Sequence, residues 1–144
     1  MTQQTINTGS GANTGTGDTL PVIVQKANAN FGELYGALKL SINAQTGTAY
    51  TIAATDMPAP NYSGALTMNN AAANTVTVPA YATTPFPVGA QLQITQLGAG
   101  QTAVAAAAGV TIHTASSFTA RVQYSTIVLT CIAQDVWVVG GDLT

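Results

Sequence analysis

The octapeptide GAQLQITQ, residues 89–96, decides the fold class of most of this chain. Leu92 and Ile94 alternate with polar side chains, a period of two that is typical of a half-buried β-strand. Similar runs follow one another downstream of residue 43, separated by segments rich in Gly, Pro, Asn and Asp. We predict strands at 48–53, 64–69, 74–79, 89–96, 102–107, 109–114, 121–126, 126–133 and 135–140. The pattern predicts a mainly β domain over residues 43–144, an antiparallel β-sandwich or jelly-roll-like domain, with no internal repeat of fixed period.

The segment upstream of this domain, residues 19–40, has the sequence TLPVIVQKANANFGELYGALKL and predicts one α-helix. Asp18 or Thr19 is suited to cap its first turn, and Pro21 stands where a missing N–H group is tolerated. Apolar side chains recur at alternating spacings of four and three, which is the pattern of a coiled-coil seam. The predicted oligomer interface consists of Leu20, Val24, Ala27, Phe31, Leu34, Tyr35 and Leu38.

This apolar stripe has two interpretations. An amphipathic helix of this kind either packs on the chain's own β-domain or associates with copies of itself. The narrow stripe favours self-association, although the pattern does not fix how many chains meet. Residues 1–18 are rich in Thr, Asn, Gln and Gly and contain one large aliphatic residue, Ile6. We therefore expect an extended arm that is ordered only by a partner.

The most unusual property of the composition is the scarcity of charge. Only 6% of the 144 residues are charged, and the formal net charge is -2. Nucleic-acid binding requires clustered cations, and this chain has only three, Lys26, Lys39 and Arg121. No apolar run approaches the length of about 20 residues that spans a membrane. The N-terminal sequence MTQQTINTGSG lacks the features of a secretory signal, so we expect synthesis in a cytoplasm.

Few residues are suited to catalysis or to metal binding. His113 is the only histidine, and Cys131 the only cysteine, within an apolar run. The five carboxylates are scattered along the chain, with no metal-ligand or acid/base spacing among them. The sequence therefore predicts a protein that is not an enzyme and that has no cofactor or metal. A hydrolase acting on cell-wall glycan, through Asp56 or Asp135, is the remaining catalytic alternative.

Aromatic side chains offer one further possibility. Trp137, the sole tryptophan, is expected to anchor the core. The alternative is a carbohydrate-binding module for host-surface glycans, in which aromatic rings stack on sugars. The candidate stacking residues are Trp137, Tyr62, Tyr81 and Tyr124.

Two segments resemble known proteins. GTGDTLPVIVQKANANFGELY, residues 15–35, resembles a motif found near the N-terminus of tailed-bacteriophage virion proteins. Residues 87–114 and 121–143 are similar to the β-domain of phage fibre, head-fibre and decoration proteins. The resemblance implies a homotrimer on the virion exterior, with the N-terminal portion attached to the particle.

From this resemblance we expect a structural virion protein, a trimeric capsid decoration (cement) or head-fibre protein that stabilises the capsid surface. Its expected partners are copies of itself and the major capsid protein or other virion proteins, without nucleic acid or membrane. A tail, neck or baseplate fibre protein is the alternative within the same class.

Overall fold

The computed structural model describes residues 4–9, 15–37 and 40–144 of the chain. The chain divides into two compact units, Met1–Lys39 and Leu40–Thr144, which we call the helical unit and the β-unit and describe separately.

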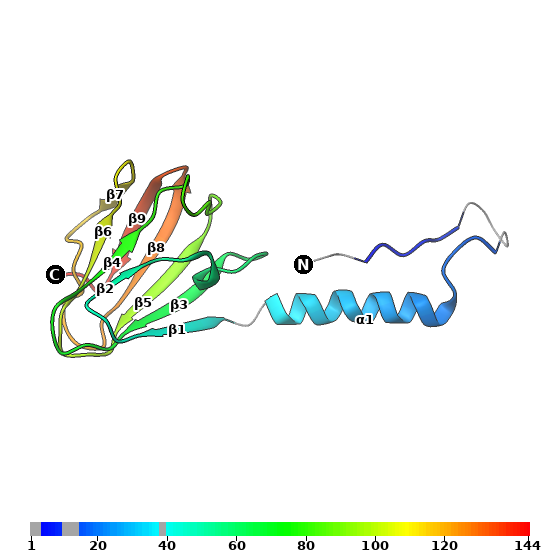
Figure 1. Ribbon diagram of the computed structural model, residues 1–144, viewed down its shortest axis with the longest axis horizontal. Helices are drawn as coiled ribbons and strands as arrows, with labels where there is room; N and C mark the ends of the chain where they lie inside the picture. The colour runs from blue at the N-terminus through cyan, green and yellow to red at the C-terminus, as the bar shows by residue number, and fades with distance from the viewer. Residues whose placement is uncertain (1–3, 10–14, 38–39) are drawn as a thin grey trace. The chain divides into compact units, whose positions relative to one another are not determined.

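The helical unit contains α1, Leu20–Ala37, and an extended segment, residues 4–9, that runs back alongside it (Figure 1). The predicted helix is confirmed. It begins one residue after the predicted start, and Ile23 N–H donates to Thr19 O at 2.9 Å in its first turn. Residues 38 and 39 lie outside the described residues, so the predicted end of the helix is not observed. No helix among the described residues is long and apolar enough to cross a membrane.

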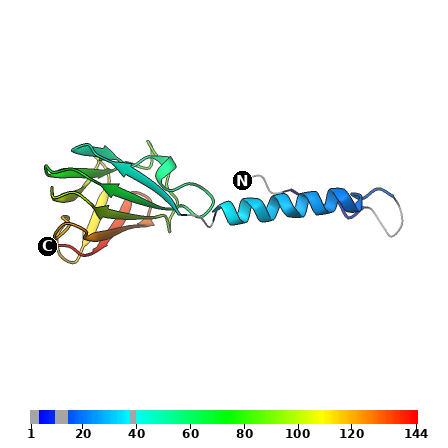
Figure 2. The ribbon, with the colours of Figure 1, turned by 90° about the horizontal axis from the view of Figure 1, so that it is seen from below.

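The β-unit is built from two sheets that face each other (Figures 1 and 2). The six-stranded sheet has the order β1-β3-β5-β8-β9-β7, and the three-stranded sheet has the order β2-β4-β6. The strands are β1 (Ser41–Gln45), β2 (Ala49–Thr51), β3 (Ser63–Met68), β4 (Asn74–Val78), β5 (Gln91–Gln96), β6 (Thr102–Ala106), β7 (Thr111–Thr114), β8 (Thr126–Ala133) and β9 (Val136–Gly141). A short 3-10 helix, η1 (Ala54–Asp56), follows β2.

The mainly β prediction is confirmed, but the prediction of antiparallel pairing is wrong for most of the unit. Strands β1, β3 and β5 pair in parallel, and so do β2, β4 and β6. The pairs β5–β8 and β8–β9 are antiparallel, and β7 pairs with β9 in parallel. Alternation of apolar and polar residues reports burial of one face and not strand direction, so the sequence pattern could not distinguish these cases.

The parallel pairs arise because the chain winds through three stacked coils, each of which gives one strand to each sheet. These coils are β1–β2, β3–β4 and β5–β6. Ser63 pairs with Gln91 and Asn74 with Thr102, so the second and third coils are offset by 28 residues in both sheets. The first coil is offset by less, since Ser41 pairs with Gly64. The sequence shows no visible repeat, although the three coils form a solenoid-like stack.

Glycine makes the stacking of two turns possible. A Cβ atom on Gly98 would lie 2.1 Å from Asn70 O, and one on Gly100 would lie 1.9 Å from Ala72 O. Both distances are far below van der Waals contact. The turn after β5 therefore lies directly on the turn after β3, because these two positions carry no side chain.

Two strand predictions differ from the structure. Residues 121–125 form a turn and not a strand, because Ser125 Oγ accepts a bond from Val122 N–H at 3.0 Å and Tyr124 has a φ of 70°. Strand β1 was missed, because its inward side chains, Asn43 and Gln45, are polar and hide the alternation.

The core lies between the sheets and consists of their inward side chains. One row crosses the larger sheet through Leu66, Ile94 and Ile127, which pair in register. Trp137 packs edge-on against Phe86, with ring centroids 5.9 Å apart. Further members of this core are Ile52, Met57, Met68, Val76, Val78, Ala90, Leu92, Val104, Ala120, Leu129, Cys131 and Val139.

Candidate functional site

The predicted interface residues of α1 form an exposed apolar ridge. We call Leu20, Val24, Ala27, Phe31, Leu34 and Tyr35 the ridge. Leu20 and Tyr35 are 73% and 71% exposed, and Phe31 is 57% exposed. Leu38, the last predicted member, lies outside the described residues. Apolar side chains this open to water along one helix face are unfavourable unless something covers them.

A neighbouring face of α1 holds the arm. Gln4 and Asn30 exchange two hydrogen bonds, from Gln4 N–H to Asn30 Oδ1 at 2.8 Å and from Asn30 Nδ2 to Gln4 O at 3.1 Å. Lys26 Nζ donates to Thr5 O at 2.9 Å. The arm was expected to gain order only from a partner molecule. Residues 4–9 instead bond to the helix of their own chain.

Asp18 and Lys26 form a further set of bonds that holds the arm. The Asp18 carboxylate accepts bonds from Asn7 N–H at 2.8 Å and from Lys26 Nζ at 2.6 Å. These bonds lower the pKa of Asp18, with the Lys26 bond as the larger cause. Asp18 N–H donates in turn to Asn7 O at 2.8 Å. Among the described residues, the carboxylate thus binds the arm and not the first turn of the helix, which was its predicted role.

The ridge and the arm do not compete for the same surface. An α-helix turns by about 100° per residue, so Lys26 and Asn30, which bond to the arm, point about 120° and about 80° away from Leu20. A shallow groove between arm and helix is lined by Gln4, Val22, Gln25, Lys26 and Ala29. The arm covers that side of the helix and leaves the ridge available for a second molecule.

Sequence reasoning missed the residues that bind the arm. Asp18 was predicted as a helix cap, Lys26 was noted as one of three cations, and Asn30 only as part of the 15–35 motif. Their spacing of eight and four residues repeats on one side of a helix, which was the available signal. Their partners, Gln4 and Asn7, lie too far away in sequence for such a pattern to identify.

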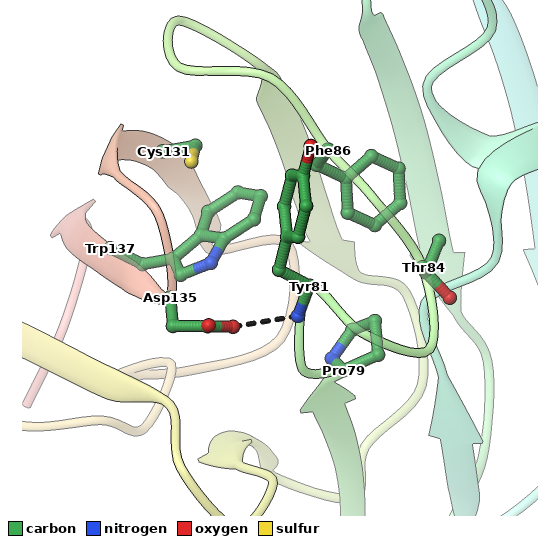
Figure 3. Close-up of a pocket in the computed structure, with 7 residues that line it drawn as sticks. All are labelled: Pro79, Tyr81, Thr84, Phe86, Cys131, Asp135 and Trp137. Carbon is green, nitrogen blue, oxygen red and sulfur yellow. Dashed lines mark hydrogen bonds between the residues drawn. The ribbon is translucent and has the colours of Figure 1, made fainter.

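Of the candidate stacking residues, Trp137 and Tyr81 lie together. Both line a small pocket with Pro79, Thr84, Phe86, Cys131 and Asp135 (Figure 3). The volume of this pocket is about enough for one water molecule. Trp137 is only 2% exposed, so its ring offers no free face to a sugar, whereas Tyr81 is 42% exposed. Asp135 Oδ1 accepts a bond from Tyr81 N–H at 2.6 Å and fixes this corner.

The other two tyrosines lie at opposite ends of β5. Gln91 N–H, at the start of that strand, donates to Tyr62 O, whereas Tyr124 N–H donates to Gln96 O at its end. Six residues of β-strand span roughly 17 Å or more. The structure therefore does not gather the four aromatic residues into one platform.

Cys131 and His113 do not form a nucleophile pair. Cys131 pairs with Trp137 and points into the core, while His113 pairs with Val138 on the outer side of the sheet. Burial raises the pKa of the Cys131 thiol, and its Sγ donates to Ala133 O at 3.3 Å. The thiol is therefore a protonated core group.

Asp56 is buried and saturated with hydrogen bonds. Its carboxylate accepts bonds from Asn43 Nδ2 at 2.6 Å, Tyr50 OH at 2.7 Å and Ala53 N–H at 2.7 Å. Burial and the bond to Asp56 raise the pKa of Tyr50 to about 12. Asn43 also accepts a bond from Gln45 at 2.8 Å. Asn43 pairs in register with Leu66, which pairs with Ile94, so Asn43 occupies the position of that core row in the first coil. The network is therefore the polar end of the apolar core.

Arg121 and Asp142 form an ion pair in the β-unit. Arg121 Nε donates to Asp142 at 2.6 Å, and this bond lowers the pKa of Asp142. No three His, Cys, Asp or Glu side chains within residues 4–9, 15–37 and 40–144 are grouped so that they could hold a metal ion. Comparison of the sequence with protein-family models and with curated proteins finds no match.

Proposed function

We propose that this chain is a self-assembling structural protein of a virion, a trimeric capsid decoration or head-fibre protein that uses the ridge of α1 to join three copies. One observation carries the proposal: the ridge is exposed along α1, while the arm bonds to a neighbouring face of the helix and leaves the ridge uncovered. The number three, and the virion, rest on the resemblance of residues 15–35 and of the β region to phage virion proteins.

Association through the ridge is energetically reasonable. Each large apolar side chain contributes about 1.5–3 kcal/mol when fully buried, and Leu20, Phe31 and Leu34 are all at least half exposed. A helix of 18 residues is marginal alone, and the interior Gly32 and Gly36 cost about 1 kcal/mol each relative to Ala. Copies packed along the ridge would offset that cost. On a capsid, such a trimer would add apolar contacts at joints between subunits.

The assembly is tested by measuring mass in solution. Sedimentation of the full chain is expected to give a trimer, and Phe31→Lys with Leu34→Lys is expected to give a monomer, because two ammonium groups would enter the seam. The matched control is Gln25→Lys, on the arm side of the helix, which should remain trimeric. A monomeric wild-type chain would overturn the proposal.

The position on the particle is tested by electron microscopy of virions that carry the chain. Copies in sets of three on the capsid surface would support the decoration or head-fibre assignment. Copies at the neck, tail or baseplate would favour the fibre alternative instead. Absence of the chain from purified particles would contradict both.

Glycan binding is a second candidate function, favoured by Tyr81. Tyr81 is 42% exposed, and its backbone N–H is bonded to the Asp135 carboxylate, so an aromatic ring for stacking and a polar group for hydrogen bonding belong to one corner. Binding on a glycan array that is lost in Tyr81→Ala and kept in Tyr124→Ala would support it. Equal binding by both variants would reject this site.

A further inference from the structure

The outer face of the six-stranded sheet has no charged side chain. We use the term outer face for the residues of β1, β3, β5, β7, β8 and β9 that point away from the core. The β-unit contains four charged residues: Asp56 in η1, Arg121 paired with Asp142, and Asp135 in the turn before β9. None of them is on the outer face. Solvated sheet faces usually carry Lys and Glu, which keep proteins apart.

Apolar side chains lie on this face. Val128 and Val138 are both 37% exposed, and Ile42, at the first strand of the sheet, is 68% exposed. Val128 is opposite Gln93, and Val138 lies between Thr130 and His113, so none of these neighbours is Asp, Glu, Lys or Arg. The outer face of the three-stranded sheet carries only Ala and Thr and has no large exposed apolar residue.

We infer that the outer face of the six-stranded sheet is a second self-association surface, whose occupant is the β-unit of a neighbouring copy in the same assembly. This inference rests on the proposed association through the ridge. Helix α1 ends at Ala37 and β1 begins at Ser41, so the chain between them spans at most roughly 15 Å. Parallel helices packed about 8–10 Å apart would therefore tether neighbouring β-units at high effective concentration.

The size of the outer face explains why its association depends on the linked helices. The six strands contain 35 residues in all, so at about 3.3 Å per residue and about 4.8 Å between strands they cover roughly 550 Å² of plane. A stable interface between free proteins buries about 800 Å² on each partner. The outer face is thus too small to hold two free molecules together, but it is large enough to add to an interface that the ridge has already formed.

The test compares dissociation of full-length variants on dilution, measured by sedimentation. Val128→Lys with Val138→Lys is expected to dissociate at concentrations at least tenfold higher than the wild-type chain. The matched control, Thr75→Lys with Thr77→Lys on the outer face of the other sheet, should stay within twofold of wild type. If the double valine variant does not fold, as judged by circular dichroism, Gln93→Lys replaces it, because that side chain is already exposed and polar.

The outcomes separate this inference from the proposed function. The second surface alone would be overturned by two results together. The valine variant would dissociate at the same concentration as the wild-type chain, and the variant with Phe31→Lys and Leu34→Lys would be a monomer. Weakening of the valine variant, with an intact trimer in the ridge variant, would overturn the ridge and also the claim that the sheet contact depends on it. A wild-type chain that is monomeric throughout would overturn both.

Discussion

In the β-unit, Leu66, Ile94 and Ile127 form a row with no more than 1% of their surface exposed, whereas Phe31 and Leu34 of α1 leave at least half of theirs in water. Both regions have regular apolar patterns, but only the β-unit contains the surface that covers its pattern. The helical unit uses hydrogen bonds to hold its arm and leaves its apolar side open. The β-unit therefore covers its own apolar pattern within one chain, whereas the ridge stays open to water and is covered only under the proposed self-association.

The largest expected effect tests the completeness of the β-unit. Leu66→Ala should lower its free energy of unfolding by about 3–5 kcal/mol, because the side chain is fully buried and its removal leaves a cavity. Urea denaturation followed by Trp137 fluorescence measures this loss. Val88→Ala, at a position that is 65% exposed, should change it by less than about 0.5 kcal/mol. Equal effects of the two substitutions would contradict a closed core.

The next effect concerns the polar end of the same core. Asp56→Ala removes the acceptor of three donors, those of Asn43, Tyr50 and Ala53, and should cost about 2–3 kcal/mol. The same urea titration applies. Asp142→Ala, in an exposed pair, is the control and should cost far less. A small loss in the Asp56 variant would show that water replaces the carboxylate and that the first coil is open.

A smaller effect is expected at the stacked turns. Gly100→Ala should destabilise the β-unit by about 1–3 kcal/mol, because its Cβ would overlap the backbone of Ala72. Gly47→Ala is the matched control, since the nearest atom there is 3.5 Å away and no shift is required. Thermal unfolding monitored by circular dichroism distinguishes the two. Similar midpoints would mean that the turns are not in contact.

The smallest effect belongs to the helical unit and depends on pH. The pKa of Asp18 is lowered in the folded chain, so its bonds stabilise the arm above the ordinary aspartate pKa of 3.8, and this stability is lost as the pH falls through the lowered value. An NMR titration should show the Asn7 amide signal moving at acid pH without a change in the β-unit. Asp18→Asn should abolish that titration. An Asn7 signal that is unchanged in the wild-type chain would exclude the carboxylate as the holder of the arm.

The sequence predicted those elements whose pattern is local. Helix α1 was found because Pro21 marks its start and the ridge recurs every three to four residues. Strand β5 was found because Leu92 and Ile94 alternate with polar residues. Strand β1 was missed because its inward Asn43 and Gln45 belong to a polar network. Polar residues at inward positions give a sequence pattern that is typical of a loop.

The sequence did not allow us to predict which strands pair or in which direction. Parallel and antiparallel strands show the same alternation, so the coils could not be inferred from β3 or β5 alone. Their offset of 28 residues is hidden because register partners differ in type, as Met68 and Gln96 do. The ridge was identified because apolar spacing is local, whereas the bond between Gln4 and Asn30 joins residues 26 positions apart.

The stack of coils also bears on how the length of this protein can change. The second and third coils share a constant offset in both sheets, and the second coil pairs with the first and the third in both sheets. A duplicated segment of 28 residues inserted between them would meet matching strands on both sides, provided that it kept the glycines of the stacked turn. Gene duplication could thus lengthen the β-unit by one strand spacing, about 4.8 Å, for each added coil.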